Sequence, residues 1–164
     1  NTSIDGLPVV GNENDVFITE NTEFALAIGY PDIKKQVVEN LIRKQAQFIS
    51  IRTSCDIGNR SQVGKSVLLK NVVISIDCKI GDYVFIDAGV TIGHDVQVGD
   101  YSHIGSGVFV GGQAKIGNGV TIHPKACIAQ NVKIGDGAII GLGAVVFKDV
   151  AENQTMIGNP ARAI

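Results

Sequence analysis

The stretch TIGHDVQVGDYSHIGSG, residues 91–107, carries an aliphatic residue at every sixth position: Ile92, Val98 and Ile104. A β-strand repeats its buried side chains every two residues and an α-helix about every 3.6, so neither element alone gives this period. The period runs from Leu68 to Val146 without interruption. Its first positions are Leu68, Ile74, Ile80, Ile86, Ile92, Val98, Ile104, Val110, Ile116, Ile122, Ile128, Ile134, Ile140 and Val146. A fixed hexapeptide period is typical of a parallel β-helix.

The fifth position of each hexad is equally restricted, because it always holds a small or β-branched residue. These residues are Val72, Cys78, Val84, Val90, Val96, Ser102, Val108, Ala114, Val120, Ala126, Val132, Ala138, Ala144 and Val150. Two earlier hexads, which begin at Ile57 and Val63, stand one residue out of phase with the rest. We therefore expect a tightened corner near Val67.

The composition agrees with a core of small aliphatic side chains. The 164 residues are 45% hydrophobic but only 5% aromatic, with 20 glycines and no Trp. A net charge of −2 and the lack of a Lys/Arg run give no reason to expect nucleic acid as a partner. No stretch approaches the roughly 18–20 apolar residues of a membrane span, so we expect no membrane insertion. Cys55, Cys78 and Cys127 lack metal-ligand spacing, which indicates reduced thiols in a cytoplasmic protein.

Residues 1–50 follow a different pattern and predict a small α/β unit. Residues 23–29 and 47–51 are typical of short strands, and the segment between them is typical of a helix with Pro31 in its first turn. The apolar face expected for this helix is Ile33, Val37, Leu41 and Ile42. One such unit cannot cover both faces of a parallel sheet, so we expect an upstream segment of at least ~30 residues to be missing.

The hexads KIGDYVF, TIGHDVQ and KIGDGAII and the ending MIGNPARAI resemble the hexapeptide-repeat acyltransferases. The chain is most similar to the bacterial sugar-nucleotide acetyltransferases of the bacillosamine, perosamine and sialic-acid type. This resemblance implies a left-handed parallel β-helix of triangular section, three hexads per coil, and a homotrimer that binds acetyl-CoA between subunits. GLPVVG and FALAIGYPDIKKQVVENL look like the second half of the family's Rossmann-like domain.

The expected organisation is therefore mainly β. Residues 1–50 form a partial Rossmann-like α/β domain that binds a nucleotide sugar, and residues 51–164 form the left-handed β-helix. Gly29, inside the Rossmann-like segment, is the expected substrate-binding residue. The implied function is acetyl transfer from acetyl-CoA to the amine of a nucleotide-linked amino sugar.

With three hexads per coil, residues 18 apart stack at about 4.8 Å. One corner column repeats the same turn chemistry and should be structural: Asp82, Asp100, Asn118 and Asp136. A second column is irregular and holds Ile76, His94, Gly112 and Gln130. A third irregular column holds Ala88, Ser106, Pro124 and Leu142. Irregular positions on a periodic scaffold are where functional residues are expected.

His94 is the candidate general base, because it stacks one coil from Gly112, whose backbone can approach a ligand closely. An N–H beside that base could stabilise the oxyanion of a thioester under attack. Asp95 could orient the imidazole and strengthen it as a base. The resemblance supports this reading, since the related enzymes use a His followed by an acidic residue, without an acyl-enzyme. GHD, residues 93–95, matches that pattern.

The resemblance also implies acetyl-CoA contacts at His103, Gly112, Pro124 and Leu142. Pro124 departs from the pattern because proline has no N–H, which leaves only its carbonyl for a contact. Asp87 is a second departure, since the relatives carry Asn there; this carboxylate either favours an amino-bearing acceptor or is simply solvated. His123 has no counterpart and is expected on the surface.

Three alternatives remain open. A zinc-dependent γ-type carbonic anhydrase shares this fold, but His94, His103 and His123 lack the short spacing of its ligands, so we expect no metal. A non-catalytic β-helix scaffold is the second alternative, and the presence of the candidate catalytic motif GHD, residues 93–95, argues against it. O-acetylation of a sugar or serine hydroxyl stays within the same enzyme class, and the nucleotide-sugar unit argues against it.

Overall fold

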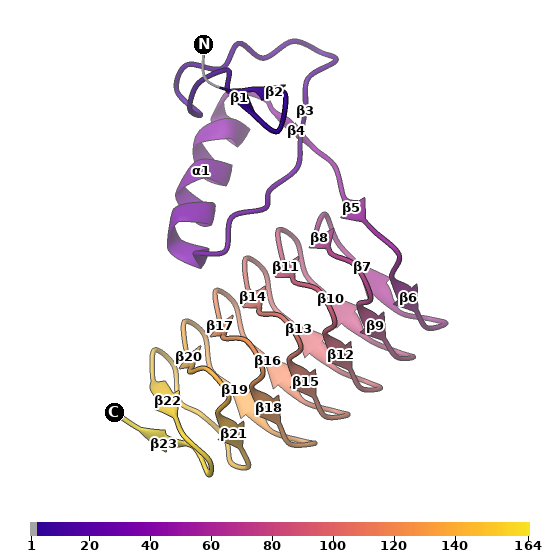
Figure 1. Ribbon diagram of the computed structural model, residues 1–164, viewed down its shortest axis with the longest axis vertical. Coiled ribbons are helices and arrows are strands. Elements are labelled where there is room, and N and C mark those ends of the chain that lie inside the picture. Colours follow the sequence, from indigo (N-terminus) through magenta and orange to yellow (C-terminus); the bar gives the residue numbers. More distant parts are fainter. Residues whose placement is uncertain (1–2) are drawn as a thin grey trace.

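The computed structural model describes residues 3–164. Figure 1 shows a straight stack of coils with the N-terminal unit at one end. In that unit, β1 (Ser3–Ile4) and β2 (Leu7–Pro8) pair antiparallel. β3 (Glu23–Phe24), α1 (Pro31–Arg43) and β4 (Gln47–Phe48) follow, and β3 pairs parallel with β4. The predicted strand–helix–strand unit is confirmed, although the first strand is shorter than residues 23–29.

Three sheets form the sides of the β-helix. The eight-stranded sheet contains β5 (Ile51–Arg52), β8 (Val67–Leu68), β11 (Phe85–Ile86), β14 (His103–Ile104), β17 (Thr121–Ile122), β20 (Ile139–Ile140), β22 (Thr155–Ile157) and β23 (Arg162–Ala163). The six-stranded sheet contains β6 (Asp56–Ile57), β9 (Val73–Ile74), β12 (Thr91–Ile92), β15 (Phe109–Val110), β18 (Cys127–Ile128) and β21 (Val145–Val146). The five-stranded sheet contains β7 (Gln62–Val63), β10 (Lys79–Ile80), β13 (Gln97–Val98), β16 (Lys115–Ile116) and β19 (Lys133–Ile134).

The strand register confirms three hexads per coil. Leu68 pairs with Ile86, 18 residues further along the chain, and the later coils keep this offset. Val63 instead pairs with Ile80, an offset of 17, so the corner between Val63 and Leu68 is one residue shorter than the others. This is the tightened corner expected near Val67.

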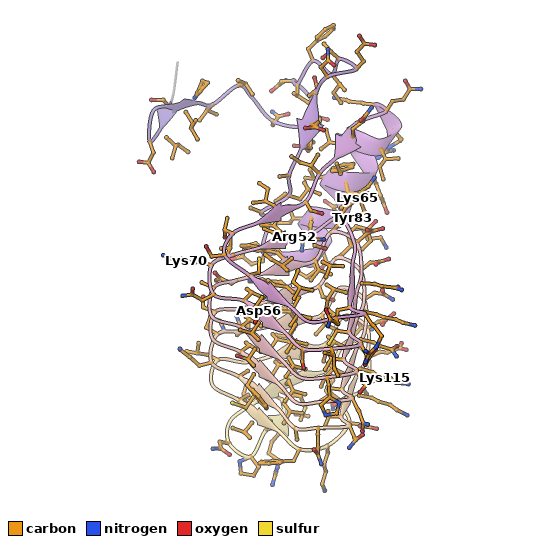
Figure 2. The ribbon with its side chains drawn as sticks, turned by 90° about the vertical axis from the view of Figure 1, so that its right-hand side faces the viewer. Arg52, Asp56, Lys65, Lys70, Tyr83 and Lys115 are labelled. Atoms are coloured by element: carbon orange, nitrogen blue, oxygen red, sulfur yellow. The ribbon has the colours of Figure 1, made fainter. Side chains whose placement is uncertain are left out.

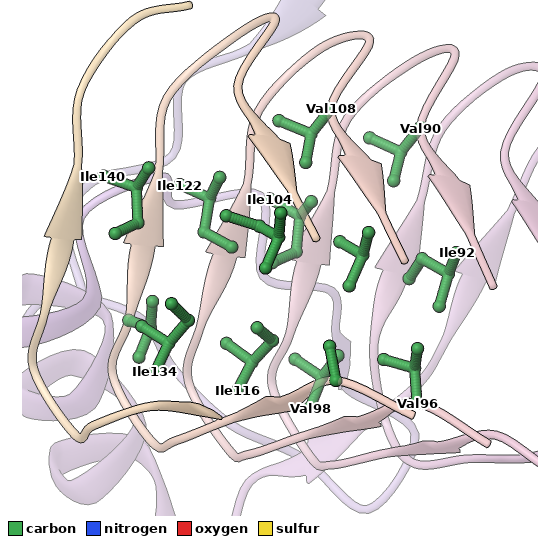
Figure 3. Packing of buried hydrophobic residues seen from close by; sticks show 14 of the residues in the cluster. Val90, Ile92, Val96, Val98, Ile104, Val108, Ile116, Ile122, Ile134 and Ile140 are labelled. Atoms are coloured by element: carbon green, nitrogen blue, oxygen red, sulfur yellow. The ribbon is translucent and has the colours of Figure 1, made fainter. Parts of the chain in front are cut away.

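The core is the column of aliphatic side chains inside the coils, seen from close by in Figure 3. The first and fifth positions of the hexads point inward, and Ile92, Ile104 and Ile122 are fully buried. Each such side chain contributes roughly 1.5–3 kcal/mol by leaving water. Ser66 and Ser102 are polar exceptions. The Ser102 hydroxyl donates to the Gly117 carbonyl at 2.9 Å and accepts the Val120 N–H at 3.1 Å. The buried hydroxyl is therefore satisfied and links successive coils.

The column that begins at Asp82 is a structural corner, as predicted. The Asp82 N–H donates to Asp100 Oδ1 at 2.8 Å, and the Asp100 N–H donates to Asn118 Oδ1 at 2.9 Å. The Asn118 N–H continues the ladder to Asp136 Oδ1 at 2.8 Å. Each side chain thus satisfies the turn N–H of the previous coil, which explains why this corner repeats the same residue types.

Aromatic residues pack the N-terminal unit against this corner of the β-helix. Tyr83 and Tyr101 stack with ring centroids 5.2 Å apart, and Phe48 packs edge-on to Tyr83 at 5.1 Å. Both tyrosines pack against the apolar cluster of Leu26, Val38, Leu41 and Phe48. Figure 2 shows Tyr83 next to the helix. The N-terminal unit and the β-helix are therefore joined by a packed seam.

The predicted apolar face of α1 was right for Leu41, which is buried, and for Val37, which packs against the apolar cluster, but wrong for Ile33 and Ile42. The helix buries Lys34, Val38 and Leu41, whereas Ile33 and Ile42 are 52% and 49% exposed. The buried face is rotated because its N-terminal end lies on the carbonyl groups of the corner, which require a hydrogen-bond donor and not an isoleucine. No helix within residues 3–164 has the length and hydropathy needed to cross a membrane.

Candidate active site

His94 and Asp95 lie in the turn between β12 and β13, where the six-stranded and five-stranded sheets meet. His94 Nδ1 is 2.8 Å from Asp95 Oδ2. Asp95 has a positive φ of 58°, and its N–H donates to the Ile76 carbonyl of the preceding coil at 3.0 Å. The turn thus holds the carboxylate against one ring nitrogen and leaves Nε2 free of it. This is the orientation expected for Asp95.

Gly112 lies one coil further along the same column, and its missing side chain makes room for the imidazole. A Cβ atom at Gly112 would lie 2.7 Å from His94 Nε2 and 3.0 Å from its carbon neighbours, closer than real contacts allow. The Gln113 N–H donates to the His94 carbonyl at 2.8 Å and fixes the two coils in register. The predicted stacking of His94 and Gly112 is therefore present.

The N–H of Gly112 also differs from its equivalents at the structural corner. There, carboxylate and amide oxygens accept the turn N–H groups of Asp82, Asp100 and Asn118. Within residues 3–164, no side chain accepts the Gly112 N–H in this way. A donor without such a partner, next to a histidine ring nitrogen, is the arrangement that an oxyanion site requires.

His103 lies elsewhere, on the outer side of β14, and it meets Gly29. The imidazole stacks on Phe85 with ring centroids 5.2 Å apart and an angle of 8° between the planes. A Cβ atom at Gly29 would lie 3.3 Å from His103 Cε1 and 3.4 Å from Nδ1. Nε2 is buried and has no hydrogen-bond partner within residues 3–164. The structure thus brings together the residue expected to bind substrate and one expected to bind acetyl-CoA.

The surroundings of His103 favour its neutral form. Burial lowers the pKa of the imidazole most, and the positive charge of Lys34 lowers it further. The Asp87 carboxylate and the Gly29 backbone oppose this shift in pKa, while His123 adds to it. A neutral imidazole has one nitrogen that donates and one that accepts, so the ring can take a hydrogen bond from a ligand.

Pro124 and Leu142 occupy the third corner, between the eight-stranded and six-stranded sheets. Leu142 is 74% exposed. The Pro124 carbonyl already accepts the Gly143 N–H at 3.0 Å, so only its second lone pair is available to a ligand. His123, next to Pro124, is exposed as expected.

Asp87 has a structural role at the same corner. One carboxylate oxygen accepts the Ala88 N–H at 2.7 Å, and the other accepts the Ser106 hydroxyl at 2.6 Å. One oxygen is engaged within the turn and the other by a residue of the next coil, so the reading of Asp87 as a merely solvated carboxylate was wrong.

The predicted site residues therefore form three groups on one chain: His94 with Asp95 and Gly112, His103 with Gly29, and Pro124 with Leu142. Each group lies on a different corner or side of the β-helix. A separate hollow of about 470 Å³ lies at the last coil, and its lining, which includes Lys148 and Arg162, contains none of these residues. In the part of the chain that the structure describes, no three His, Cys, Asp or Glu side chains gather as metal ligands.

Comparison with known families identifies the repeat. The profile of the bacterial transferase hexapeptide family (six repeats) matches residues 77–112 and 113–148. Residues 77–148 therefore match the hexapeptide repeat of this family. A search of curated protein sequences found no match to this hexapeptide-repeat chain.

Solved structures resemble the hexapeptide-repeat chain over most of its length. The acetyltransferase domain of PglB from Neisseria gonorrhoeae FA1090, in complex with acetyl coenzyme A, has a TM-score of 0.90 and 27% identity, covering 99% of this chain and 81% of that one. WeeI from Acinetobacter baumannii AYE has a TM-score of 0.76 and 26% identity, with coverages of 99% and 81%.

A more distant match shows the fold alone. A histidine-to-asparagine variant of perosamine N-acetyltransferase from Caulobacter crescentus, in complex with CoA and GDP-perosamine, has a TM-score of 0.84 and 23% identity, covering 87% of this chain and 69% of that one.

One residue of the seam, Lys34, was missed by the sequence reasoning. A lysine between exposed helical residues is typical of a solvated face, and no spacing distinguishes Lys34 from Lys35. Only the packing of α1 against the β-helix corner shows that Lys34 is buried.

Proposed function

We propose that this chain transfers the acetyl group of acetyl-CoA to the amine of a nucleotide-linked amino sugar. The amine nitrogen attacks the thioester carbonyl directly, the carbon–sulfur bond breaks, and CoA leaves as its thiol. His94 removes the proton from the attacking amine and passes it to the departing sulfur, and because the amine attacks the thioester directly, no acyl-enzyme forms. The observation that carries this proposal is the group formed by His94, Asp95 and Gly112.

The geometry of that group suits its roles. Asp95 lies on Nδ1 of His94, so Nε2 is the nitrogen that can accept the proton, and Asp95 stabilises the imidazolium that results. Nε2 lies against Gly112, so the backbone N–H of this glycine is close to the base. The amine and the thioester oxygen would meet there, with the developing negative charge near the Gly112 N–H.

The ligands of similar proteins support the class of substrate. The PglB domain was solved with acetyl coenzyme A, and the perosamine enzyme with CoA and a GDP-linked amino sugar. On this chain we assign acetyl-CoA to His103, Gly112, Pro124 and Leu142, and the nucleotide sugar to the N-terminal unit through Gly29.

A homotrimer would complete the site. The three groups of site residues lie on different sides of one chain, so a single β-helix cannot enclose a ligand between them. The outer residues of the five-stranded sheet are polar and exposed, among them Lys79, Lys115 and Lys133. Lys115 points away from the β-helix in Figure 2. The other two sheets carry outward Phe85 and Phe109 and are better suited to face neighbouring subunits.

The test is an acetyl-CoA consumption assay against UDP-, GDP- and dTDP-linked amino sugars. Matched nucleotide sugars with a hydroxyl in place of the amine distinguish N- from O-acetylation. We expect CoA thiol release with at least one amino sugar, together with an acetylated product by mass spectrometry. Release with the hydroxyl sugars alone would establish O-acetylation, and no release with any acceptor would favour a scaffold.

A further inference from the structure

Lys34 is a fully buried lysine in the seam between the N-terminal unit and the β-helix. It lies in the first turn of α1, and its ammonium group reaches the corner beneath the helix. Nζ donates to the Tyr83 carbonyl at 2.9 Å and to the Ser102 carbonyl at 3.2 Å. The Ser102 carbonyl also accepts the Phe85 N–H at 3.0 Å, whereas no backbone N–H within residues 3–164 donates to the Tyr83 carbonyl. Lys34 therefore supplies the hydrogen-bond partner of the part-buried Tyr83 carbonyl and shares the buried Ser102 carbonyl with a backbone N–H.

No carboxylate pairs with this buried charge among the described residues. Burial alone lowers the pKa of Lys34 from 10.5 to about 8. His103 on the β-helix lies close enough for the charge of Lys34 to affect its pKa. Tyr83 and Tyr101 pack against the apolar cluster of α1, and Glu39 of the same helix acts on Tyr101. Asp82 and Asp100 of the corner accept backbone N–H groups in the ladder. Burying a lysine without an ion-pair partner destabilises the folded chain. The hydrogen bonds of Lys34 to the two carbonyls offset part of this cost, and they are the physical reason for its buried position.

The segment before Lys34 carries the contacts that matter for the site. Gly29 lies against the His103 imidazole, and Pro31 packs over Gly119 of the next coil, where an added Cβ would lie 3.9 Å from the proline Cβ. The Lys34 N–H donates to the Tyr30 carbonyl at 2.9 Å and continues the helix from this segment. A side chain that fixes the first turn of α1 to two successive coils thus also fixes residues 29–31.

We propose that Lys34 is a positioning residue that fastens the start of α1 to the β-helix and thereby holds Gly29 against His103. The inference rests on the proposed function for its kinetic consequence, because Gly29 is assigned to the nucleotide sugar. Loss of Lys34 should therefore weaken nucleotide-sugar binding and leave the group around His94 in place. The lowered pKa of His103 agrees with a positive charge held close to the ring.

The experiment compares Lys34→Met, Lys34→Arg and Lys35→Met in the full chain. Methionine keeps the stem of Lys34 and removes its N–H donors, while arginine keeps donors and charge. Lys35 is the matched control, since it is the neighbouring lysine and is exposed. Hydrogen exchange of the α1 amides reports the docking of the helix, and the amides of β12 to β17 report the β-helix itself. The NMR titration of the His103 ring reports whether the positive charge of residue 34 remains beside the imidazole.

For Lys34→Met we expect α1 exchange to rise about tenfold with protection of β12 to β17 unchanged, and the titration of His103 to move to higher pH. Lys34→Arg should retain slower α1 exchange than Lys34→Met, and Lys35→Met should match the wild type. In active enzyme, KM for the nucleotide sugar should rise about tenfold in Lys34→Met, with KM for acetyl-CoA and kcat within twofold. Exchange and titration in Lys34→Met equal to those in Lys35→Met would overturn the proposal. These two measurements need no activity, so they remain decisive if the proposed function fails.

Discussion

The imidazole of His94 occupies the space that a side chain on Gly112 would need: a Cβ atom there would lie 2.7 Å from Nε2. The two residues belong to successive coils of the same column, and the Gln113 N–H holds them in register through the His94 carbonyl. The position of the ring is thus determined from both sides, by Asp95 on Nδ1 and by the glycine at Nε2. This relationship is the basis of the assignment of His94 as a base.

Gly112→Ala should displace His94 and lower kcat by roughly 10²–10³, the loss typical of a disturbed oxyanion site. The reason is steric, because the new methyl group and the ring cannot both keep their places. Steady-state kinetics measure the effect. Gln130→Ala is the control, since Gln130 is an exposed residue one coil further in the same column. An unchanged kcat in Gly112→Ala would remove the glycine from the account.

Asp95→Asn should lower kcat by less than the removal of His94 itself, because Asp95 acts through the imidazole and not on the substrate. The amide can still lie near Nδ1, but it lacks the charge that stabilises the imidazolium. Thermal unfolding should be close to that of the wild type, since both side chains are more than half exposed. A loss as large as that of His94→Ala would mean that Asp95 has a more direct role.

His103→Ala should raise KM for acetyl-CoA and leave kcat within a fewfold of the wild type. The ring is assigned to the cofactor, and its unpartnered Nε2 is free to bond a ligand. Isothermal titration with CoA gives the affinity directly. His123→Ala serves as the comparison, because His123 is exposed and should not change the affinity. Weaker binding of the nucleotide sugar alone would reassign His103 to the substrate side, where Gly29 lies.

The stability of the wild type relative to Lys34→Met should rise between about pH 8 and pH 10.5. The folded pKa of Lys34 is lowered from 10.5 to about 8, so the unfolded chain binds more protons in this window and unfolding becomes less favourable as pH rises. The relative gain is at most about 3 kcal/mol over the whole window. Denaturant unfolding of both proteins at several pH values measures it. A difference that is flat with pH would show that Lys34 titrates as it does in water.

Much of the fold follows from local pattern. A hexad that places Ile or Val at one position and a small residue at another has one inward side, which predicts a β-helix. The closure of each coil by three hexads was implied by the resemblance to the acyltransferases. The short corner between Val63 and Leu68 is visible as a change of phase in the sequence. A coil of three hexads contains 18 residues, so residues 18 apart form columns, and His94 stacks on Gly112 for this reason.

The contacts between the two halves do not follow from any period. Lys34 is buried because α1 packs on carbonyl groups of a corner 49 and 68 residues further along the chain. The helical pattern favours Ile33 and Ile42 as buried residues, yet tertiary packing rotates the helix. The hydrogen bond of Asp87 was also not predictable from the sequence. Its partner Ser106 lies in the next coil, and residue type alone does not indicate that the two side chains bond.

The most direct test of the account is the steady-state rate of His94→Ala with an amino-sugar nucleotide that the wild type acetylates. If His94 is the general base, kcat should fall by roughly 10²–10⁴ with acetyl-CoA affinity nearly unchanged. The loss should shrink at high pH, where more of the acceptor amine is already neutral. Circular dichroism should show an intact β-helix in the variant. A His94→Ala protein that keeps more than about half of its kcat would contradict the mechanism proposed for this site.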